Sequence, residues 1–373
     1  MVSTYDLAHP QPTDWSLAAE AELVVALEKC EAQIATEPAH AIAWQQRSYF
    51  LGRLGRYQDA VASYQKTLAL AAEDPMVWCN YATSLAAAGW TAEAVNAYNQ
   101  ALELAPQHPK IWVRRGRVLH RLQKYSDAIE SYEQALALTP QEGQVWYCKG
   151  LSAYYLNDLK GAIAAFKTAL TYQPHHREAQ LALGYAFTRA GRHDEALEAL
   201  AAPLAEGWAD ARLYACSAYL LRHQGKFTEA LQQLYQAVRL DPENAQIWFQ
   251  KGLTLANLSR YEEAQTAIAE SLKRQAYSAN GWLAMGLTLR HLTEYDNAVE
   301  AFNKALSITP NHPLAFFQQA CCYAALDRPD WAVEHLRRAI SIDSAKYYPR
   351  VFQESALQAL PNHQLAPALK AAS

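Results

Sequence analysis

The sequence lacks three features that would assign it to a familiar class of protein. It has no uninterrupted apolar run of about 18 residues, so we expect no membrane insertion. Its first residues, MVSTYDLAHPQPTDW, have neither a basic start nor an apolar stretch, unlike a secretory signal. Basic residues are not in excess either, since 33 Lys and Arg stand against 37 Asp and Glu, a formal net charge of −4. General binding to nucleic acid is therefore not expected.

The cysteines lack the spacing that metal sites and redox motifs use. None of the six forms a CxxC pair, and only Cys321 and Cys322 are neighbours. In a chain of 373 residues this usage favours reduced, half-buried thiols over a disulfide framework or a zinc site. We therefore predict a cytoplasmic protein with no metal or other cofactor.

What the sequence does contain is a period of 34 residues. Tryptophan recurs on this period at residues 44, 78, 112, 146, 248 and 282. We number the residues of each repeat as places 1 to 34, the first repeat starting at residue 41. Place 8 is often glycine, place 20 is always alanine, and proline recurs near the end of the repeat. These residues are Gly116, Gly150, Gly184, Gly252 and Gly286; Ala60, Ala94, Ala128, Ala162, Ala196, Ala230, Ala264, Ala298 and Ala332; and Pro106, Pro140, Pro174, Pro242 and Pro310.

This pattern resembles the tetratricopeptide repeat (TPR), in which tryptophan and glycine mark the first helix, alanine and an aromatic residue the second, and proline the end. The resemblance covers about four-fifths of the chain. In this respect the chain is similar to bacterial proteins built entirely of such repeats. It implies an all-α fold: a right-handed α–α superhelix (TPR solenoid) of nine 34-residue helical hairpins with terminal capping helices. The nine repeats start at residues 41, 75, 109, 143, 177, 211, 245, 279 and 313.

The recurring residues have physical roles. Glycine at place 8 and alanine at place 20 are small because we expect the two helices of a hairpin to cross there at close range. Proline after the second helix cannot continue it and so sets the turn to the next repeat. One hairpin cannot bury its apolar face alone, so stacked neighbours must do so for each other, and the ends need caps.

The predicted organisation has four parts. Residues 1–13 are a flexible N-terminus, and 14–38 form an N-terminal capping helix with Thr13 or Asp14 as its N-cap. Residues 41–344 hold the nine repeats. Residues 345–373 make a closing helix, from Tyr347 to Leu360, and a loose tail.

The fifth repeat, 177–210, keeps the length but departs from the pattern. Gln180 replaces the tryptophan, and Pro203 falls inside the expected second helix, which we predict to stop near Ala202. Two interpretations stay open. Either Trp208 repacks the gap left by a drifted repeat, or the repeat is a seam at which the array changes pitch or hinges.

In the TPR family the first helices line a concave groove, and places 2, 5, 6, 9, 12 and 13 tend to point into it. Here those places carry arginine and tyrosine and almost no acidic residue, Glu178 being the main exception. Such a surface suits an extended, acidic segment with aromatic or aliphatic side chains, because arginine binds carboxylates in a bidentate fork and tyrosine offers rigid contact area. The predicted partner-binding residues are Tyr49, Asn80, Lys110, Arg114, Arg117, Arg121, Tyr147, Tyr154, Tyr185, Arg189, Tyr219, Arg222, Phe249 and Arg290.

The third repeat concentrates this charge in KIWVRRGRVLHR, residues 110–121. Some TPR co-chaperones hold a partner's C-terminal carboxylate in a two-carboxylate clamp, and Asn80, Lys110 and Arg114 match three of its five residues. Gln45 and Tyr49 stand where the other two would be. A C-terminal clamp and a less specific anion-preferring groove are both open.

Several other residues are predicted to have structural roles. Cations at place 7, among them Arg115, are expected to pack their stems and hold their heads in solvent. Histidines 40, 108, 176 and 312 all fall at place 34, which indicates turn chemistry between repeats and not metal binding. Cysteines at places 5 and 6 have no nearby histidine and acid that would make a nucleophile. With no catalytic motif and no room for a further domain, we predict that the protein is not an enzyme.

The sequence thus favours a protein–protein interaction scaffold, acting as an adaptor, a co-chaperone or an assembly factor for a larger complex. Its partner would be a protein or peptide segment, with an acidic segment and a C-terminus both open, and homo-oligomerisation stays open. Two alternatives remain. An RNA-binding helical repeat is favoured by Arg and Tyr on one face but opposed by the acidic total charge. A regulatory peptide receptor would usually carry an attached DNA-binding domain.

Overall fold

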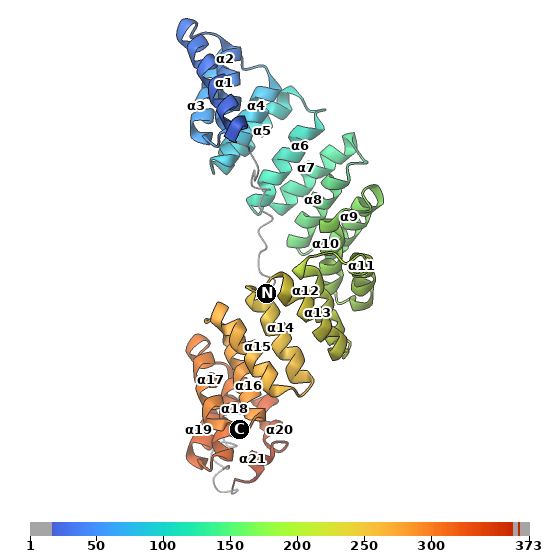
Figure 1. Ribbon diagram of the computed structural model, residues 1–373, viewed down its shortest axis with the longest axis vertical. Helices are drawn as coiled ribbons and strands as arrows, with labels where there is room; N and C mark the ends of the chain where they lie inside the picture. The colour runs from blue at the N-terminus through green and yellow to red at the C-terminus, as the bar shows by residue number, and fades with distance from the viewer. Residues whose placement is uncertain (1–16, 361–364, 366–373) are drawn as a thin grey trace. The chain divides into compact units, whose positions relative to one another are not determined.

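The computed structural model describes residues 17–360 and residue 365, and in this part of the chain every regular element is a helix (Figure 1). The chain divides into two compact units, residues 1–190 (unit 1) and 191–373 (unit 2). Each unit is a row of antiparallel helical hairpins, so the all-α repeat fold expected from the 34-residue period is confirmed.

From residue 17 on, where the structure describes it, unit 1 contains a leading helix, four complete hairpins and the first helix of the fifth repeat. Its helices are α1 (Leu17–Thr36), α2 (Ala41–Arg53), α3 (Tyr57–Leu70), α4 (Pro75–Ala87), α5 (Thr91–Leu104), α6 (Pro109–Arg121), α7 (Tyr125–Leu138), α8 (Gly143–Tyr155), α9 (Leu159–Tyr172) and α10 (Arg177–Arg189).

Among its described residues, unit 2 contains the second helix of the fifth repeat, four further hairpins and two short closing helices, α20 and α21. Its helices are α11 (His193–Ala205), α12 (Ala211–His223), α13 (Phe227–Leu240), α14 (Ala245–Asn257), α15 (Tyr261–Arg274), α16 (Ala279–His291), α17 (Tyr295–Ile308), α18 (Pro313–Ala325), α19 (Pro329–Ile342), α20 (Ser344–Val351) and α21 (Ser355–Gln358).

Close contact between the two helices of a hairpin explains the glycines and alanines. All nine alanines at place 20 have 0% of their surface exposed. A Cβ built on Gly286 would lie 2.5 Å from Cε1 of Phe302, and one on Gly150 would lie 2.6 Å from Phe166. The aromatic side chain of the second helix therefore packs directly against the backbone of the first, as the small residues predict.

Each tryptophan at place 4 also fixes the preceding turn. Its indole N–H donates to the carbonyl oxygen six residues earlier, as Trp112 does to Pro106 at 2.8 Å. In the fifth repeat Gln180 makes the same bond to Pro174, also at 2.8 Å. The replacement thus keeps the turn while losing the ring.

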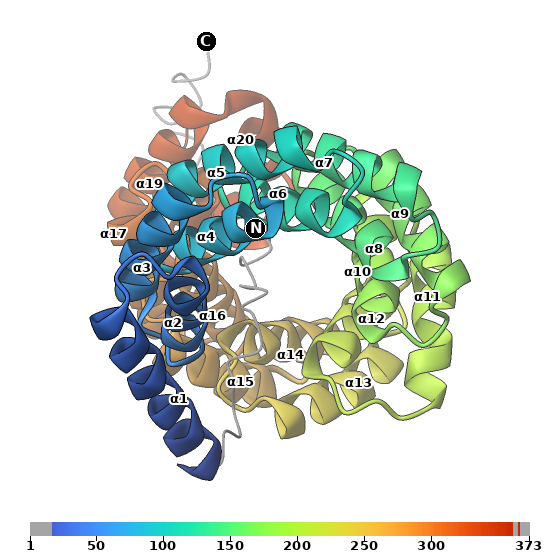
Figure 2. The same cartoon turned by 90° about the horizontal axis from the view of Figure 1, so that it is seen from above.

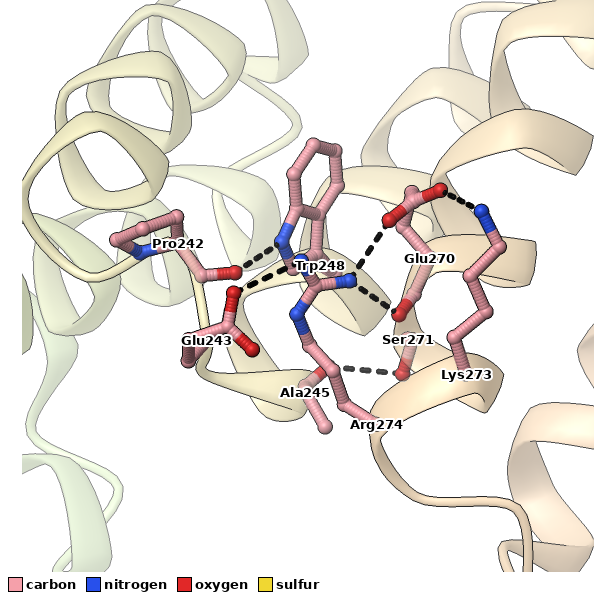
Figure 3. A network of polar contacts seen from close by, with 8 residues as sticks. All are labelled: Pro242, Glu243, Ala245, Trp248, Glu270, Ser271, Lys273 and Arg274. Atoms are coloured by element: carbon pink, nitrogen blue, oxygen red, sulfur yellow. Dashed lines mark hydrogen bonds and ion pairs between the residues drawn. The ribbon is translucent and has the colours of Figure 1, made fainter.

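Cations lie over most of the tryptophan rings at place 4, as Trp248 illustrates (Figure 3). The guanidinium of Arg274 lies 5.5 Å from the ring centre, donates to the backbone and carboxylate of Glu270, and pairs with Glu243 at 3.3 Å. Lys251 covers the same ring at 4.7 Å. These contacts join α15 to the start of α14 and bury most of the arginine.

The turn inside each hairpin has a left-handed residue at place 15. Only Gly or a residue that tolerates positive φ fits this position at low cost. The nine residues are Gly55, Gly89, Gln123, Asn157, Gly191, Gly225, Ser259, Thr293 and Asp327, with φ between 55° and 90°.

First helices lie next to one another along each unit. In unit 1, α4 contacts α6 and α6 contacts α8, in addition to the contact of each with its own second helix. Figure 2 shows α6 and α8 on the inner side of α7 and α9. The side chains of successive first helices therefore meet on this inner side.

The fifth repeat corrects one prediction. Its second helix, α11, continues past Ala202 to Ala205, with Pro203 inside its last turn. Pro203 is buried, and Gly207, whose φ is +66°, makes the turn that follows the helix. The proline lacks the N–H that would bond the preceding turn, and burial of its ring offsets part of that loss. Trp208 is 9% exposed, so its ring is buried beside this end.

The closing helix also differs from the prediction. Instead of one helix from Tyr347 to Leu360, α20 ends at Val351 and α21 begins at Ser355. A straight helix would turn Leu357 about a quarter of a turn away from Tyr347 and about a third of a turn away from Val351. The break lets all three side chains become buried.

At the other end α1 begins at Leu17 among the described residues. The proposed caps Thr13 and Asp14, the segment 1–13, and the tail beyond Leu360 except Leu365 lie outside the described residues.

Candidate partner-binding face

Four cations form a stripe along one side of α6. Lys110, Arg114, Arg117 and Arg121 are separated by four, three and four residues, a spacing that places side chains on one face of a helix. Arg114 is half-buried and the other three are exposed. The remaining sides of α6 bury a separate set, Ile111, Gly116, Val118 and Leu119. We call the four cations the α6 stripe.

Arg114 connects α6 to α4. Its Nη1 donates to Oδ1 of Asn80 at 3.3 Å, to Oγ1 of Thr83 at 3.5 Å and to Sγ of Cys79 at 3.3 Å. The structure thus brings together Asn80 and Arg114, two residues of the predicted clamp. Lys110 lies one turn before Arg114 on the same side, and it has no described hydrogen bond or ion pair.

The other two arginines of the stripe also reach neighbouring first helices. Arg121 donates from Nη2 to the backbone oxygen of Ala86 in α4 at 2.8 Å. Burial dominates the pKa of the Cys148 thiol in α8, and the positive charge of Arg117 nearby opposes its rise. Burial nevertheless raises the pKa of Cys148, as it does for Cys79 beside Arg114, so both thiols stay protonated and act as packing residues.

No carboxylate neutralises the α6 stripe among the described residues. The ion pairs of unit 1 use other cations, namely Arg47 with Glu31, Arg56 with Asp59 and Lys149 with Glu133. The stripe therefore presents uncompensated positive charge, with its guanidinium groups held in place by polar neighbours.

Aromatic residues flank the stripe on both sides. In α2, Arg53 donates to the hydroxyl of the exposed Tyr49 at 2.9 Å. Toward the other end of unit 1, the guanidinium of Arg189 lies 4.5 Å from the ring centre of Tyr154 and donates to Asn157 at 2.8 Å.

The remaining two predicted tyrosines of unit 1 are less accessible. Tyr185 in α10 is half-buried. Tyr147 is 6% exposed, and its ring lies 4.7 Å from His176 and 6.0 Å from Phe166. Tyr147 therefore offers little open area and mainly packs between helices.

Unit 2 carries the other four predicted residues. Arg222 lies over the ring of Tyr219 at 5.8 Å, and burial lowers the pKa of this guanidinium from its ordinary value. Phe249 is half-buried and packs toward α16. Arg290 is engaged by the chain itself, since its Nη1 donates to Gln318 at 2.6 Å and its Nη2 pairs with Glu354 at 3.3 Å.

Arg115, next to the stripe in sequence, has the structural role expected of it. Its Nε donates to Asn99 at 2.8 Å and its Nη1 to Ser131 at 2.6 Å, while its guanidinium lies 5.8 Å from the Trp112 ring centre. Contrary to expectation, the head is held by the second helices and does not simply extend into solvent. These polar partners on α5 and α7 are the reason.

The histidines at place 34 act as helix caps. Nδ1 of His40, His176 and His312 accepts the backbone N–H of the third residue of the following helix at 3.0 to 3.3 Å. No group of three or more His, Cys, Asp or Glu side chains in the described part of the chain is placed to bind a metal ion. The turn role predicted for these residues is confirmed at three of the four positions.

Sequence reasoning missed several residues of this face. Thr83, Asn157, Gln318 and Glu354 each contact one of its arginines. Places 6 and 9 would have suggested Gln318 and Thr83, because these are the places where successive first helices meet. Glu354 lies outside the repeats, so no periodic signal points to it.

None of the described helices has both the length and the apolar character needed to cross a membrane.

Models of the tetratricopeptide repeat match residues 79–143, 147–211 and 249–313 and, in a second form, residues 41–74, while a TPR repeat model matches residues 218–259. A comparison with curated proteins finds no match.

Solved structures share the fold at low sequence identity. A chain of the APC/C hetero-tetramer Cut9–Hcn1 is 15% identical, with a TM-score of 0.51 over 91% of this chain and 82% of that one. PilF of Pseudomonas aeruginosa is 19% identical, with a TM-score of 0.50 over 57% of this chain and 97% of that one.

Proposed function

Because the chain belongs to the tetratricopeptide repeat family, whose fold generally serves as a protein-binding scaffold, we propose that it holds an extended acidic segment of a partner protein on its first-helix face. The observation that carries this proposal is the α6 stripe, which has no carboxylate partner within the described chain. The role is non-enzymatic, as an adaptor, co-chaperone or assembly factor in the cytoplasm.

The energetics favour a multivalent contact. One exposed ion pair contributes only about 0–1 kcal/mol, so a single arginine would not hold a partner. Four cations on one helix face, flanked by Tyr49 and Tyr154, allow several charge-assisted hydrogen bonds and aromatic contacts together. Asn80, Thr83 and Ala86 already hold two of the arginines, so less side-chain freedom is lost on binding.

The test is a charge reversal with a matched control. Lys110→Glu combined with Arg117→Glu changes two exposed side chains of the stripe and leaves Arg114 and its hydrogen bonds intact. The control, Lys66→Glu with Lys160→Glu, makes the same change in net charge on the exposed sides of α3 and α9. Circular dichroism should show equal helicity for both.

The readout is affinity purification from the native host. We expect the principal partner to be retained by the wild type and the control and lost from the stripe variant. Retention of that partner by the stripe variant would show that the α6 stripe is not the main binding site.

The C-terminal clamp is a specific form of this proposal, supported by the contact between Asn80 and Arg114. Once the partner segment is known, a peptide with a free C-terminus should bind more tightly than its C-terminal amide if the clamp operates. Equal affinities would leave side-chain carboxylates as the ligands.

The RNA-binding alternative is addressed by titrating a generic labelled oligonucleotide at low salt, where phosphate contacts are strongest. We expect no binding. Saturable, salt-sensitive binding that the stripe variant loses would favour RNA over a protein partner.

A further inference from the structure

Unit 2 contains a carboxylate site that the chain fills with its own C-terminal segment. Arg290 of α16 donates to Oε1 of Gln318 in α18 and pairs with Glu354, which lies between α20 and α21. Three residues further on, Leu357 is fully buried in the cluster that includes Phe317. Figure 1 shows α21 beside α18, and the two helices are in contact. The bound motif is thus a glutamate followed by a leucine at the third position.

The same receptor residues occur two repeats earlier. Arg222, Phe249 and Gln250 each precede Arg290, Phe317 and Gln318 by 68 residues, or two periods of 34. In both cases the arginine is at place 12 of one repeat, and the Phe–Gln pair is at places 5 and 6 of the next. Helix α12 contacts α14 as α16 contacts α18, so Arg222 and Gln250 lie on neighbouring first helices at the same places as Arg290 and Gln318.

No carboxylate of the described residues pairs with the earlier copy. Arg222 takes part in none of the ion pairs of the described residues, and its buried Nε has no hydrogen-bond partner. The buried Oε1 of Gln250 also has no partner, whereas its counterpart on Gln318 accepts from Arg290. Buried polar atoms without partners are unusual and costly. A carboxylate can accept from Nε of Arg222, whereas Oε1 of Gln250 is itself an acceptor and needs a donor such as Arg222, as Gln318 accepts from Arg290.

The surroundings of Arg222 suit a planar anion next to an apolar group. The Tyr219 ring supports the guanidinium from one side, and Phe249 is only half-buried, whereas Phe317 is 1% exposed beneath the C-terminal segment. We propose that Arg222, Gln250 and Phe249 bind a partner segment carrying a glutamate followed three residues later by leucine, as Glu354 and Leu357 occupy Arg290, Gln318 and Phe317. This inference rests on the proposed function, since it assumes a protein partner, but it concerns a different compact unit from the α6 stripe.

The chain itself supplies a probe for this site. A fluorescein-labelled peptide of residues 350–360, RVFQESALQAL, is titrated into the full-length protein and followed by fluorescence anisotropy. We expect saturable binding, weakened about tenfold or more by Arg222→Gln, because one charge-assisted contact is lost. Gln250→Ala should also weaken binding. The control variant Arg239→Gln, which removes an exposed cation of α13, should bind within about twofold of wild type.

A second peptide tests whether the glutamate carboxylate is the group that is bound. Replacing its glutamate by glutamine, as in Glu354→Gln, should weaken binding to the wild type as much as Arg222→Gln does. The two changes together should cost little more than either alone, since both remove one contact. Circular dichroism on each variant checks that the fold is retained.

Three outcomes would overturn the proposal. The first is no saturable binding up to about 1 mM peptide. The second is equal affinity of wild type and Arg222→Gln, and the third is loss of binding only in Arg290→Gln, which would mean that the peptide exchanges at the occupied site. Failure here together with partner loss from the α6-stripe variant would leave the proposed function standing. If that variant keeps the partner while the peptide binds at Arg222, only the role proposed for the α6 stripe is wrong.

Discussion

Arg121 donates a hydrogen bond from Nη2 to the backbone oxygen of Ala86, 2.8 Å away at the C-terminal end of the neighbouring first helix. Arg189 makes the equivalent contact, donating from Nη1 to the backbone oxygen of Tyr154 at 3.2 Å, with the same separation of 35 residues. A helix C-terminus carries partial negative charge and unsatisfied carbonyls, so an arginine there is doubly favourable. The arginines at place 13 therefore join successive repeats as well as offering charge to a partner.

Replacing this arginine should cost stability. We expect Arg121→Ala to lower the free energy of unfolding by about 0.5–1.5 kcal/mol, the usual contribution of such a hydrogen bond. The measurement is a urea titration followed by circular dichroism. Lys66→Ala, at an exposed cation of α3, is the control and should change the value by less than about 0.5 kcal/mol. Equal midpoints for the two variants would mean that the bond to Ala86 is worth little.

A second prediction concerns the close contact inside a hairpin. In Gly286→Ala the new methyl group would lie 2.5 Å from the Phe302 ring, so the ring must shift, and we expect a loss of about 1–3 kcal/mol in the free energy of unfolding. Gly52→Ala is the matched control, because the nearest atom to its Cβ is 4.0 Å away and alanine is the better helix former by up to about 1 kcal/mol. Thermal melting should therefore fall in the first variant and stay level or rise in the second.

These contacts also show how far the sequence alone predicts the structure. The hairpins could be placed because Gly286 and Ala298 recur on the period, and a periodic constraint leaves a periodic signal. The extension of α11 through Pro203 was not predictable in this way, because it depends on burial of one ring that no other repeat has. Likewise, the arginines of the face could be identified from their places, but the pairing of Arg290 with Glu354 depends on a break in the helix after the last repeat.

The turn at place 15 gives a stabilising substitution. Thr293 has φ of +60° there, and a β-branched side chain is costly in this region. Its side chain is exposed, so little packing is lost on removal. We expect Thr293→Gly to raise the free energy of unfolding by about 1 kcal/mol. The converse change, Gly225→Thr at a φ of +75°, should lower it, and thermal melting of both variants tests the pair. A lower melting temperature for Thr293→Gly would show that the turn is not strained.

The last prediction is a loss of stability in acid that is caused by protonation of a histidine cap. Nδ1 of His176 accepts the N–H of Ala179 at 3.2 Å, which requires the neutral ring. Burial lowers the pKa of His176 below its ordinary value near 6.5, so the folded state binds fewer protons than the unfolded state in this range. The stability that His176 contributes is therefore present above pH 6.5 and is lost as the pH falls through the lower, folded-state pKa.

The variant His176→Asn separates this effect from the other titrating groups. Asparagine is a good N-cap and does not titrate, so the variant should keep the cap at low pH. Urea midpoints measured between about pH 7.5 and pH 5 should fall for both proteins, because burial also lowers the pKa of His120 and His335. The decline should be shallower for His176→Asn. Parallel declines would mean that protonation of His176 does not break the cap.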